Sequence, residues 1–386
     1  MEYRLDELFN LQMGKTPSRN NPEYWDSEDY KWISIGDLSK CGKYICETKE
    51  HLSGKAIAES GISQIPANTV IMSFKLSIGK TAITPEPMYS NEAIMSFRDK
   101  KVVPLLPDYI FYMFSGRDWN AGTNKAVMGK TLNKATLSQI KIKVHSLPEQ
   151  QEIVRVLDKA TAIIEARQQE LQKLDDLVKA RFVEMFGAPE TNSKEWSKDT
   201  LSNHLNVIGG YAFKSDLFAV EGIPVLRIGN INAGFFQPTN MVYWKQDDSL
   251  SRYMMYAGDL VMSLTGTAGK DDYGNVCILG NDYDRYYLNQ RNAKLELFPT
   301  LNKHYLSQIL KFPAVKKKLT GISRGVRQAN ISNKDILNLE IPIPPIDLQN
   351  QFAVFVKQVD KSKAVVQKAL DKAQTLFDSL MQQYFG

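Results

Sequence analysis

"PEQQEIVRVLDKATAIIEARQQELQKLDDLVKARFVEMFG", residues 148 to 187, predicts a single long α-helix. Between Pro148 and Gly187 the stretch contains neither proline nor glycine, and good helix formers dominate it. At about 1.5 Å per residue, about 37 residues give a helix about 55 Å long. Apolar residues recur three or four positions apart and form one stripe, interrupted by Arg167 and Arg181. The stripe consists of Ile153, Leu157, Ala160, Ile164, Leu171, Leu174, Val178 and Met185.

A second helix repeats the first one. A shift of 199 positions, which separates Gly187 from Gly386, also places Gln150 on Gln349. The second helix has its own apolar stripe, which Lys363 interrupts. This stripe consists of Phe352, Val356, Val359, Val366, Leu370, Ala373, Phe377, Leu380 and Tyr384. Because each stripe is longer than a small domain is wide, we expect the two helices to pack on each other as a coiled coil.

The same shift holds upstream of the helices without a gap. "LSQIKIKVHSLPEQQEI" (Leu137 to Ile153) falls on "ILNLEIPIPPIDLQNQF" (Ile336 to Phe352). Before it, "GTNKAVMGKTLNKATL" (Gly122 to Leu137) falls on "GISRGVRQANISNKDI" (Gly321 to Ile336). Two long segments in ungapped register indicate an internal duplication.

The front parts of the two copies match more loosely. "YKWISIGDLS" (Tyr30 to Ser39) parallels "IPVLRIGNIN" (Ile223 to Asn232). "PANTVIMSFKLSIGK" (Pro66 to Lys80) parallels "YAGDLVMSLTGTAGK" (Tyr256 to Lys270), and both share Met-Ser before a loop that closes on Gly-Lys. Matched helices with divergent front modules predict one shared task for the helices and two related tasks for the modules.

The sequence therefore predicts an α+β protein with a pseudo-two-fold internal repeat. Short β-rich runs between Gly, Asn and Asp turns predict that each module is mixed α/β, with a small curved sheet and peripheral helices. The predicted boundaries are residues 1–145 for the first module, 146–187 for the central helical region, 188–343 for the second module and 344–386 for the C-terminal helical region. We expect the two long helices to form an intramolecular antiparallel coiled coil.

Composition sets mild limits on function. The chain has 386 residues, of which 43% are hydrophobic and 24% charged, as is usual for a soluble globular protein. The net charge of +5 permits a polyanionic partner without requiring one. No apolar run approaches the roughly 20 residues that span a bilayer, so no membrane association is expected. Three cysteines without a C-x-x-C pair favour a reduced, cytoplasmic compartment.

Motifs that would indicate catalysis are incomplete. "GTAGKD" (Gly266 to Asp271) has too few residues between its glycines for a phosphate-binding loop, and it ends on Asp rather than Ser or Thr. "NPEY" (Asn21 to Tyr24) is better explained as a turn than as a base-gripping methyltransferase loop. Cys41, Cys46 and His51 fit no standard zinc spacing. The four histidines stand apart from any nucleophile motif, so we predict no catalytic residue and no metal site in this chain.

Nearly the full chain resembles the specificity subunit of type I restriction-modification systems. The resemblance rests on "GKTPSRNNPEYWDSEDYKWISIGDLS" (Gly14 to Ser39) in the first module. It rests also on "IPIPPIDLQNQF" (Ile341 to Phe352) and its twin "VHSLPEQQEI" (Val144 to Ile153), which lead into the helices, and on the "MFG" that ends the central helix. One departure is Ser-Leu-Pro at residues 146–148, where the second copy has the dipeptide Pro344-Pro345.

The resemblance implies a DNA reader without chemistry of its own. Each module would be a target recognition domain that reads one half of a bipartite, asymmetric site in double-stranded DNA. The helices would set the distance between the half-sites and dock two methyltransferase subunits. S-adenosylmethionine, ATP and Mg would be held by those subunits and by restriction and translocase subunits. Two alternatives stay open: a specificity chain of a methylation-only or other defence assembly, and a coiled-coil adaptor that does not bind DNA.

Candidate DNA contacts fall on loops that carry cations and polar side chains near small residues. Arginine and glutamine there can read base edges, whereas lysine more often holds phosphate. The candidates are Lys75, Lys80, Lys125, Lys130, Arg227, Thr265, Lys270, Arg324, Arg327 and Gln328.

Overall fold

The computed structural model describes residues 1–386 apart from residues 76, 120–131, 268, 271 and 322–327. The chain forms two compact units. Unit 1 contains Met1–Gln168 together with Lys368–Gly386, and unit 2 contains Gln169–Gln367. Each unit therefore combines one globular module with parts of both long helices.

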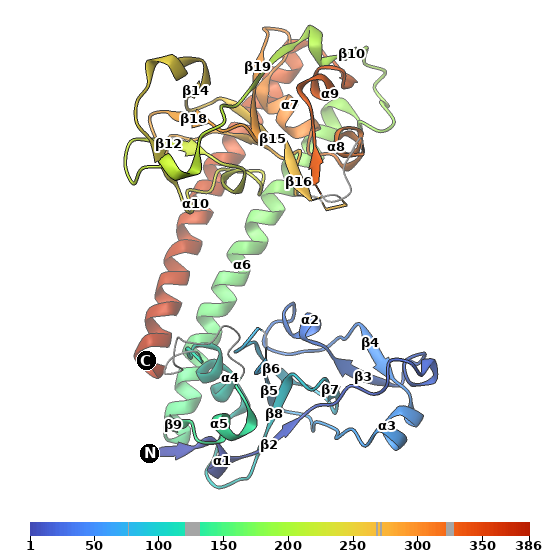
Figure 1. The fold of residues 1–386 in the computed structure, drawn as a ribbon, viewed down its shortest axis with the longest axis vertical. Helices are drawn as coiled ribbons and strands as arrows, with labels where there is room; N and C mark the ends of the chain where they lie inside the picture. Colours follow the sequence, from blue (N-terminus) through green and yellow to red (C-terminus); the bar gives the residue numbers. More distant parts are fainter. Residues whose placement is uncertain (76, 120–131, 268, 271, 322–327) are drawn as a thin grey trace. The chain divides into compact units, whose positions relative to one another are not determined.

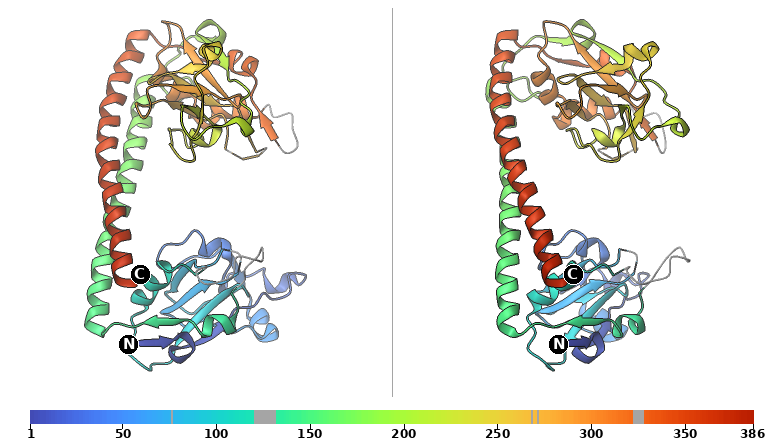
Figure 2. Two further views of the ribbon diagram at one scale, coloured as in Figure 1. Left: turned by 60° about the vertical axis from the view of Figure 1, so that its left-hand side comes forward. Right: turned by 90° about the vertical axis from the view of Figure 1, so that its left-hand side faces the viewer.

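The long helices are α6 (Leu147–Phe186) and α10 (Ile346–Phe385), each of 40 residues. Each is about 60 Å long, slightly more than the sequence predicted. Unit 1 contains the first part of α6 and the last part of α10. Unit 2 contains the last part of α6 and the first part of α10. Within each unit the two helices lie side by side (Figure 1, Figure 2), so they run antiparallel, and the predicted coiled coil is confirmed.

Burial along the predicted stripes varies with the neighbours of each residue. Ile153, Leu157 and Val178 are buried as predicted, because they pack into the hydrophobic core of a module as well as against the other helix. Ala160, Phe352, Val359 and Val366 are buried as well, whereas the other stripe residues are only half-buried. The stripe prediction missed Phe182 and Phe186, which are 1% and 3% exposed and belong to the core of unit 2. The module, and not the partner helix alone, decides which face of the helix end is covered.

Among its described residues, the module of unit 1 contains three sheets of short strands (Figure 1). Their strand orders are β2 (Phe9–Met13), β8 (Ile94–Asp99), β5 (Thr69–Ser73), β6 (Thr81–Thr84); then β4 (Glu50–Leu52), β3 (Tyr30–Ile33), β7 (Tyr89–Ser90); then β1 (Glu2–Arg4), β9 (Lys141–Lys143). The helices around them are α1 (Leu5–Leu8), η1 (Pro22–Tyr24), α2 (Ile35–Leu38), α3 (Gly54–Ser60), α4 (Pro107–Ser115) and α5 (Lys134–Ser138).

In the part that the structure describes, the module of unit 2 contains four sheets. Their strand orders are β11 (Leu205–Gly209), β19 (Asn292–Leu297), β15 (Leu260–Ser263), β17 (Val276–Ile278); then β13 (Val242–Trp244), β12 (Ile223–Leu226), β18 (Tyr286–Leu288), β14 (Met254–Met255); then β10 (Lys198–Thr200), β21 (Glu340–Pro342); then β16 (Thr265–Thr267), β20 (Gln328–Asn330). The helices are η2 (Leu201–Asn203), η3 (Ser215–Leu217), η4 (Ile228–Asn230), η5 (Asp248–Tyr253), α7 (Lys303–Ile309), α8 (Pro313–Thr320) and α9 (Asn333–Leu337).

The two modules share one topology, as the duplicated sequence predicted. The order β2-β8-β5-β6 in unit 1 corresponds to β11-β19-β15-β17 in unit 2, and all these pairs are antiparallel. In both units one pair is parallel, β3 with β7 and β12 with β18. Each module contains several small sheets instead of the single curved sheet expected from sequence, because most strands end after three to five residues at turns.

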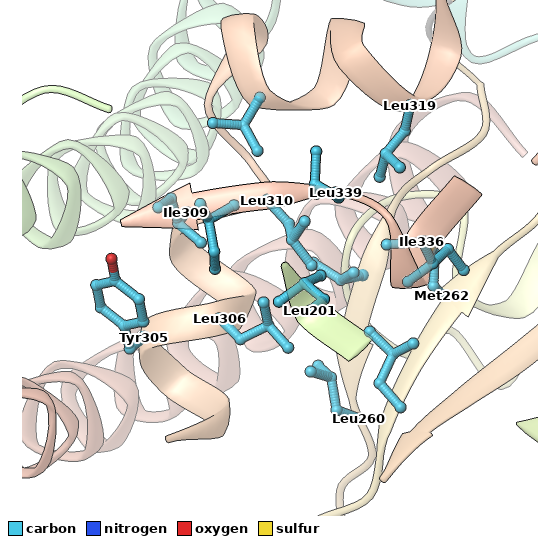
Figure 3. Packing of buried hydrophobic residues seen from close by; sticks show 14 of the residues in the cluster. Leu201, Leu260, Met262, Tyr305, Leu306, Ile309, Leu310, Leu319, Ile336 and Leu339 are labelled. Atoms are coloured by element: carbon cyan, nitrogen blue, oxygen red, sulfur yellow. The ribbon is translucent and has the colours of Figure 1, made fainter. Parts of the chain in front are cut away.

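The core of unit 2 lies between the β11-β19-β15-β17 sheet and the short helices. Figure 3 shows side chains of α7 gathered with Leu201 of η2 and with Leu260 and Met262 of β15. All of these side chains are at most 1% exposed. Leu306 and Ile309 of α7 take part, together with Leu310, which directly follows the helix. This packing joins α7 to β15.

Candidate nucleic-acid interface

The loop after β5 presents the candidate residues Lys75 and Lys80. It is closed by Ser73: the Ser73 amide donates to the Lys80 carbonyl at 2.8 Å, and the Lys80 amide donates to the Ser73 hydroxyl at 3.0 Å. Gly79 has a φ of +89°, and a Cβ there would lie 2.9 Å from the Trp119 ring, so glycine is required. Lys80 is exposed and Lys75 is half-buried beside Phe74, so both can reach a ligand outside the loop.

The loop after β15 is closed in the same way by Ser263. The Ser263 amide donates to the Asn275 carbonyl at 2.9 Å, and the Asn275 amide donates to the Ser263 hydroxyl at 3.1 Å. Gly274 has a φ of +70° and occupies the place of the glycine in unit 1. The sequence alignment, which placed Gly269-Lys270 at this point, is therefore wrong in register. The loop of unit 2 is longer because it contains β16, and the Gly-Lys dipeptide lies inside that addition.

Strand β16 pairs with β20 and forms a two-stranded ribbon. Thr265 lies opposite Asn330 and is buried by this pairing, whereas Lys270 is exposed in the turn that follows Thr267. Gln328 lies opposite Thr267 on the other strand. The ribbon thus joins two loops that the sequence analysis treated separately. The pairing spans about sixty residues of sequence, and no local pattern indicates it.

An acidic side chain, Asp272, binds the last residue of β16. The Asp272 carboxylate accepts the Thr267 amide at 2.8 Å and the Thr267 hydroxyl at 2.9 Å. The hydrogen bond from the Thr267 amide is the main cause that lowers the pKa of Asp272, to which Lys270 also contributes. Asp272 is therefore ionised at neutral pH and shapes the turn that carries Lys270.

Arg227 forms hydrogen bonds within its own module. It precedes η4, where its amide donates to the Asn230 side chain at 3.0 Å. Its guanidinium donates to the Asn240 carbonyl. In unit 1 the equivalent turn is held by Ser34, whose amide donates to Asp37 at 2.9 Å. The feature common to both copies is thus a capped turn, and the guanidinium of Arg227 already has an acceptor.

Four of the candidate residues lie outside the described residues. They are Lys125, Lys130, Arg324 and Arg327. Their assignment as DNA contacts stays a prediction. Of the remaining candidates, the fold places Lys75 with Lys80 on one loop, and Thr265 with Lys270 and Gln328 on one ribbon.

The comparison with known families decides what the duplicated architecture is. The model of the type I restriction modification DNA specificity domain matches residues 1–175 and residues 193–374. The chain belongs to this family. Both matched ranges contain one globular module and most of one long helix, so the specificity domain is the unit that is repeated.

Individual relatives support the same assignment. The MjaIX specificity subunit of Methanocaldococcus jannaschii is 26% identical over 187 residues, covering 47% of this chain and 43% of the relative. The EcoR124I/EcoR124II specificity subunit of Escherichia coli is 27% identical over 206 residues, covering 49% of each. The chain thus matches about half the length of these specificity subunits.

A solved structure has the same fold. The S subunit of a type I restriction-modification system from M. genitalium superposes with a TM-score of 0.54 at 13% identity. The match covers 100% of this chain and 96% of that one. The fold that the two chains share therefore includes both modules and both long helices.

An acidic residue lies near the loop after β5. The Thr16 hydroxyl donates to the Glu92 carboxylate, and this hydrogen bond is the main cause that lowers the pKa of Glu92. Lys75 and Arg19 contribute to the same shift. The sequence analysis did not single out Thr16, Arg19 or Glu92, because they are far from Lys75 in sequence. The negative charge of Glu92 partly offsets the positive charge of Lys75. Lys80 is therefore the exposed cation of this loop.

No metal centre or membrane span is found in the part of the chain that the structure describes. There, His, Cys, Asp and Glu side chains do not come together in groups of three or more that could hold a metal ion. Among the same residues, no helix is long and apolar enough to cross a bilayer.

His304 of α7 makes the stability of unit 2 dependent on pH. Burial, with Lys303 and Lys357 nearby, lowers the pKa of its imidazole to about 4. In the unfolded chain the pKa is about 6.5, so between these values the unfolded state binds more protons. We expect unit 2 to lose stability as the pH falls from about 6.5 to about 4, and the His304→Gln variant to lose less. Urea unfolding of both proteins across this pH range measures the free energy of unfolding. If it changed equally with pH in both proteins, His304 would not be the cause of the pH dependence.

Proposed function

We propose that this chain is the DNA-specificity subunit of a type I restriction-modification complex, with each module reading one half of a bipartite, asymmetric DNA site. The observation that carries the proposal is the repeated topology with unlike loops. A shared scaffold with different loops is the arrangement expected when two related ligand surfaces are read by one chain. The family assignment supports DNA as that ligand.

The difference between the loops is concrete. The loop after β5 closes on Gly79-Lys80, whereas its counterpart closes on Gly274-Asn275 and carries the ribbon with Lys270 as an addition. Since base edges are distinguished by the positions of donors and acceptors, two such loops would not prefer the same bases. Two different half-sites make the whole DNA site asymmetric.

The long helices would dock the catalytic partners of the complex. Leu177 and Leu376, which occupy equivalent positions in the two copies, are 48% and 56% exposed. Further apolar side chains are exposed on the same helices, namely Ile163, Val183, Val354 and Val365. Exposed apolar residues at equivalent positions suit two copies of one partner. We propose that these are two methyltransferase subunits with S-adenosylmethionine, joined by restriction subunits that use ATP and Mg, while this chain contributes no catalytic group.

Loss of a lysine on the exposed loops should weaken DNA binding without changing its sequence preference. We expect Lys80→Ala and Lys270→Ala each to reduce affinity for all duplexes alike and to lower the salt-dependence slope by about one unit. Titrations at several salt concentrations measure both effects. Lys101→Ala is the control, because Lys101 is highly exposed and already pairs with Asp99. Loss of preference at a single base position would instead assign base reading to the lysine.

The proposed function is tested by sequencing the methylated adenines of a host with and without this gene. We expect one bipartite motif to lose its methylation when the gene is removed. An adaptor that does not bind DNA predicts an unchanged methylome and no salt-dependent affinity for duplex DNA. A methylation-only assembly predicts the loss of the motif but no restriction of unmodified DNA in the host.

A further inference from the structure

We propose that Gln150 and Gln349 are positioning residues that fix the angle between each long helix and its own recognition module. Each is the fourth residue of its helix, and each is completely buried, with 0% exposure. A polar side chain in such a place must be fully engaged in hydrogen bonds to be tolerated.

In unit 1 the side chain of Gln150 connects three segments. Its Oε1 accepts the amide of Leu106, the residue before α4, at 3.0 Å. Its Nε2 donates to the carbonyl of Pro104 at 2.9 Å and to the carbonyl of His145, just before α6, at 2.9 Å. The start of the long helix is thereby tied to the start of the module's own helix.

In unit 2 the side chain of Gln349 makes the corresponding contacts. Its Oε1 accepts the amide of Asn302, the residue before α7, at 2.8 Å. Its Nε2 donates to the carbonyl of Thr300 at 3.3 Å and to the carbonyl of Pro344 at 2.8 Å. The acceptors and the donor occupy the same places relative to the helices as in unit 1.

A tyrosine reinforces each junction. The Tyr109 hydroxyl of α4 donates to the carbonyl of Lys143 at 3.2 Å, and the Tyr305 hydroxyl of α7 donates to the carbonyl of Pro342 at 2.8 Å. Lys143 and Pro342 are the last residues of β9 and β21, the strands that precede the long helices. Each module therefore holds its long helix through an amide and through a hydroxyl.

Glutamine suits this position chemically. The three backbone groups require one acceptor and two donors on a single flexible side chain, which a primary amide supplies. Glutamate has no donor when ionised, and methionine of similar size supplies neither strong donor nor acceptor. Both copies present one backbone N–H and two backbone carbonyls at this position, and both have a glutamine there.

The consequence for function rests on the proposed role of the chain as a DNA reader. A helix of about 60 Å turned by about 5° at one end moves its other end by about 5 Å. This exceeds the rise of one base pair, about 3.4 Å. A junction that permits such a turn cannot hold a fixed distance between half-sites, so the discrimination between spacer lengths depends on these two side chains.

The test compares Gln150→Met and Gln349→Met with Gln151→Met and Gln351→Met, whose wild-type side chains are exposed neighbours. The full chain is purified in the complex it forms in its host. Its affinity is measured for duplexes with the native spacer and with one base pair more or less. We expect wild type and controls to prefer the native spacer on the order of tenfold. The two buried variants should lose most of this preference, while discrimination against single-base changes within the half-sites persists.

Stability measurements separate positioning from a merely structural role. If the buried variants unfold more easily but keep the full spacer preference, the inference is overturned. Tyr109→Phe removes the hydrogen bonds of that hydroxyl with Lys143 and His145, and Tyr305→Phe removes the hydrogen bond with Pro342. Both variants serve if the methionine variants do not fold. They should reduce the preference in the same direction, and an unchanged preference would again overturn the inference. A wild-type complex without any spacer preference would instead refute the proposed function on which the inference rests.

Discussion

Shortening both long helices by four residues should shorten the spacer of the methylated DNA motif by almost two base pairs. Four residues make about one helical turn and about 6 Å, whereas one base pair of B-DNA rises about 3.4 Å. The helices run antiparallel, so both must be shortened to keep their apolar stripes together. Counting along the helices from the ion pair between Asp175 and Lys363, the segment opposite residues 167–170 is 368–371.

The experiment therefore removes residues 167–170 and 368–371 together, and the methylated adenines of a host that carries the variant are sequenced. The half-site bases should stay the same, since no residue of either globular module is changed. Removing only residues 167–170 is the control, because it shifts one apolar stripe against the other and should lower stability. A double deletion that folds, methylates DNA and retains the original gap would refute the role of the helices as a ruler.

Replacing Phe182 by alanine should destabilise unit 2 by about 3–5 kcal/mol, the cost typical of a large buried aromatic. Phe182 is 1% exposed and lies where α6 meets the core of unit 2. Its ring stacks on Tyr305 at 5.3 Å between centroids and contacts Phe312 at 5.2 Å and Phe352 at 5.5 Å. The cavity would thus weaken the contacts of α6 with α7, with α10 and with the segment before α8.

Denaturant unfolding with a probe in unit 2 measures this loss. Val183→Ala is the matched control, because the neighbouring side chain is 37% exposed and its removal should cost no more than about 0.5 kcal/mol. If both variants unfolded at the same denaturant concentration, Phe182 would not be part of the junction between helix and module.

The long-range plan of the fold was readable from the sequence for a physical reason. A helix with one long apolar stripe cannot be stable alone in water, and an identical offset along 50 residues or so specifies its partner. The starts of both helices were also predictable, since Pro148 and Pro344-Pro345 stand where the preceding segment must end.

The binding loops were less predictable, because loop closure depends on hydrogen bonds that leave little trace in sequence. Ser263 closes its loop on Gly274-Asn275, yet Gly269-Lys270 resembles the dipeptide of the first copy more closely. Likewise, Thr265 is a polar residue of the type that contacts DNA, but the pairing of β16 with β20 buries it. Exposure of a loop residue is decided by distant strands, and a local motif does not report it.

The amides of Gln150 and Gln349 have a consequence for how such a protein responds to ionic strength. Every hydrogen bond that they make joins two uncharged groups, and both glutamine residues are completely buried. Dissolved ions screen attractions between exposed charges, but they have little effect on buried neutral contacts. Salt that weakens the hold of lysines on a polyanion therefore leaves the angle between helix and module unchanged. Under the proposed function, the affinity for DNA would therefore vary with ionic strength, whereas the spacing between the half-sites would not.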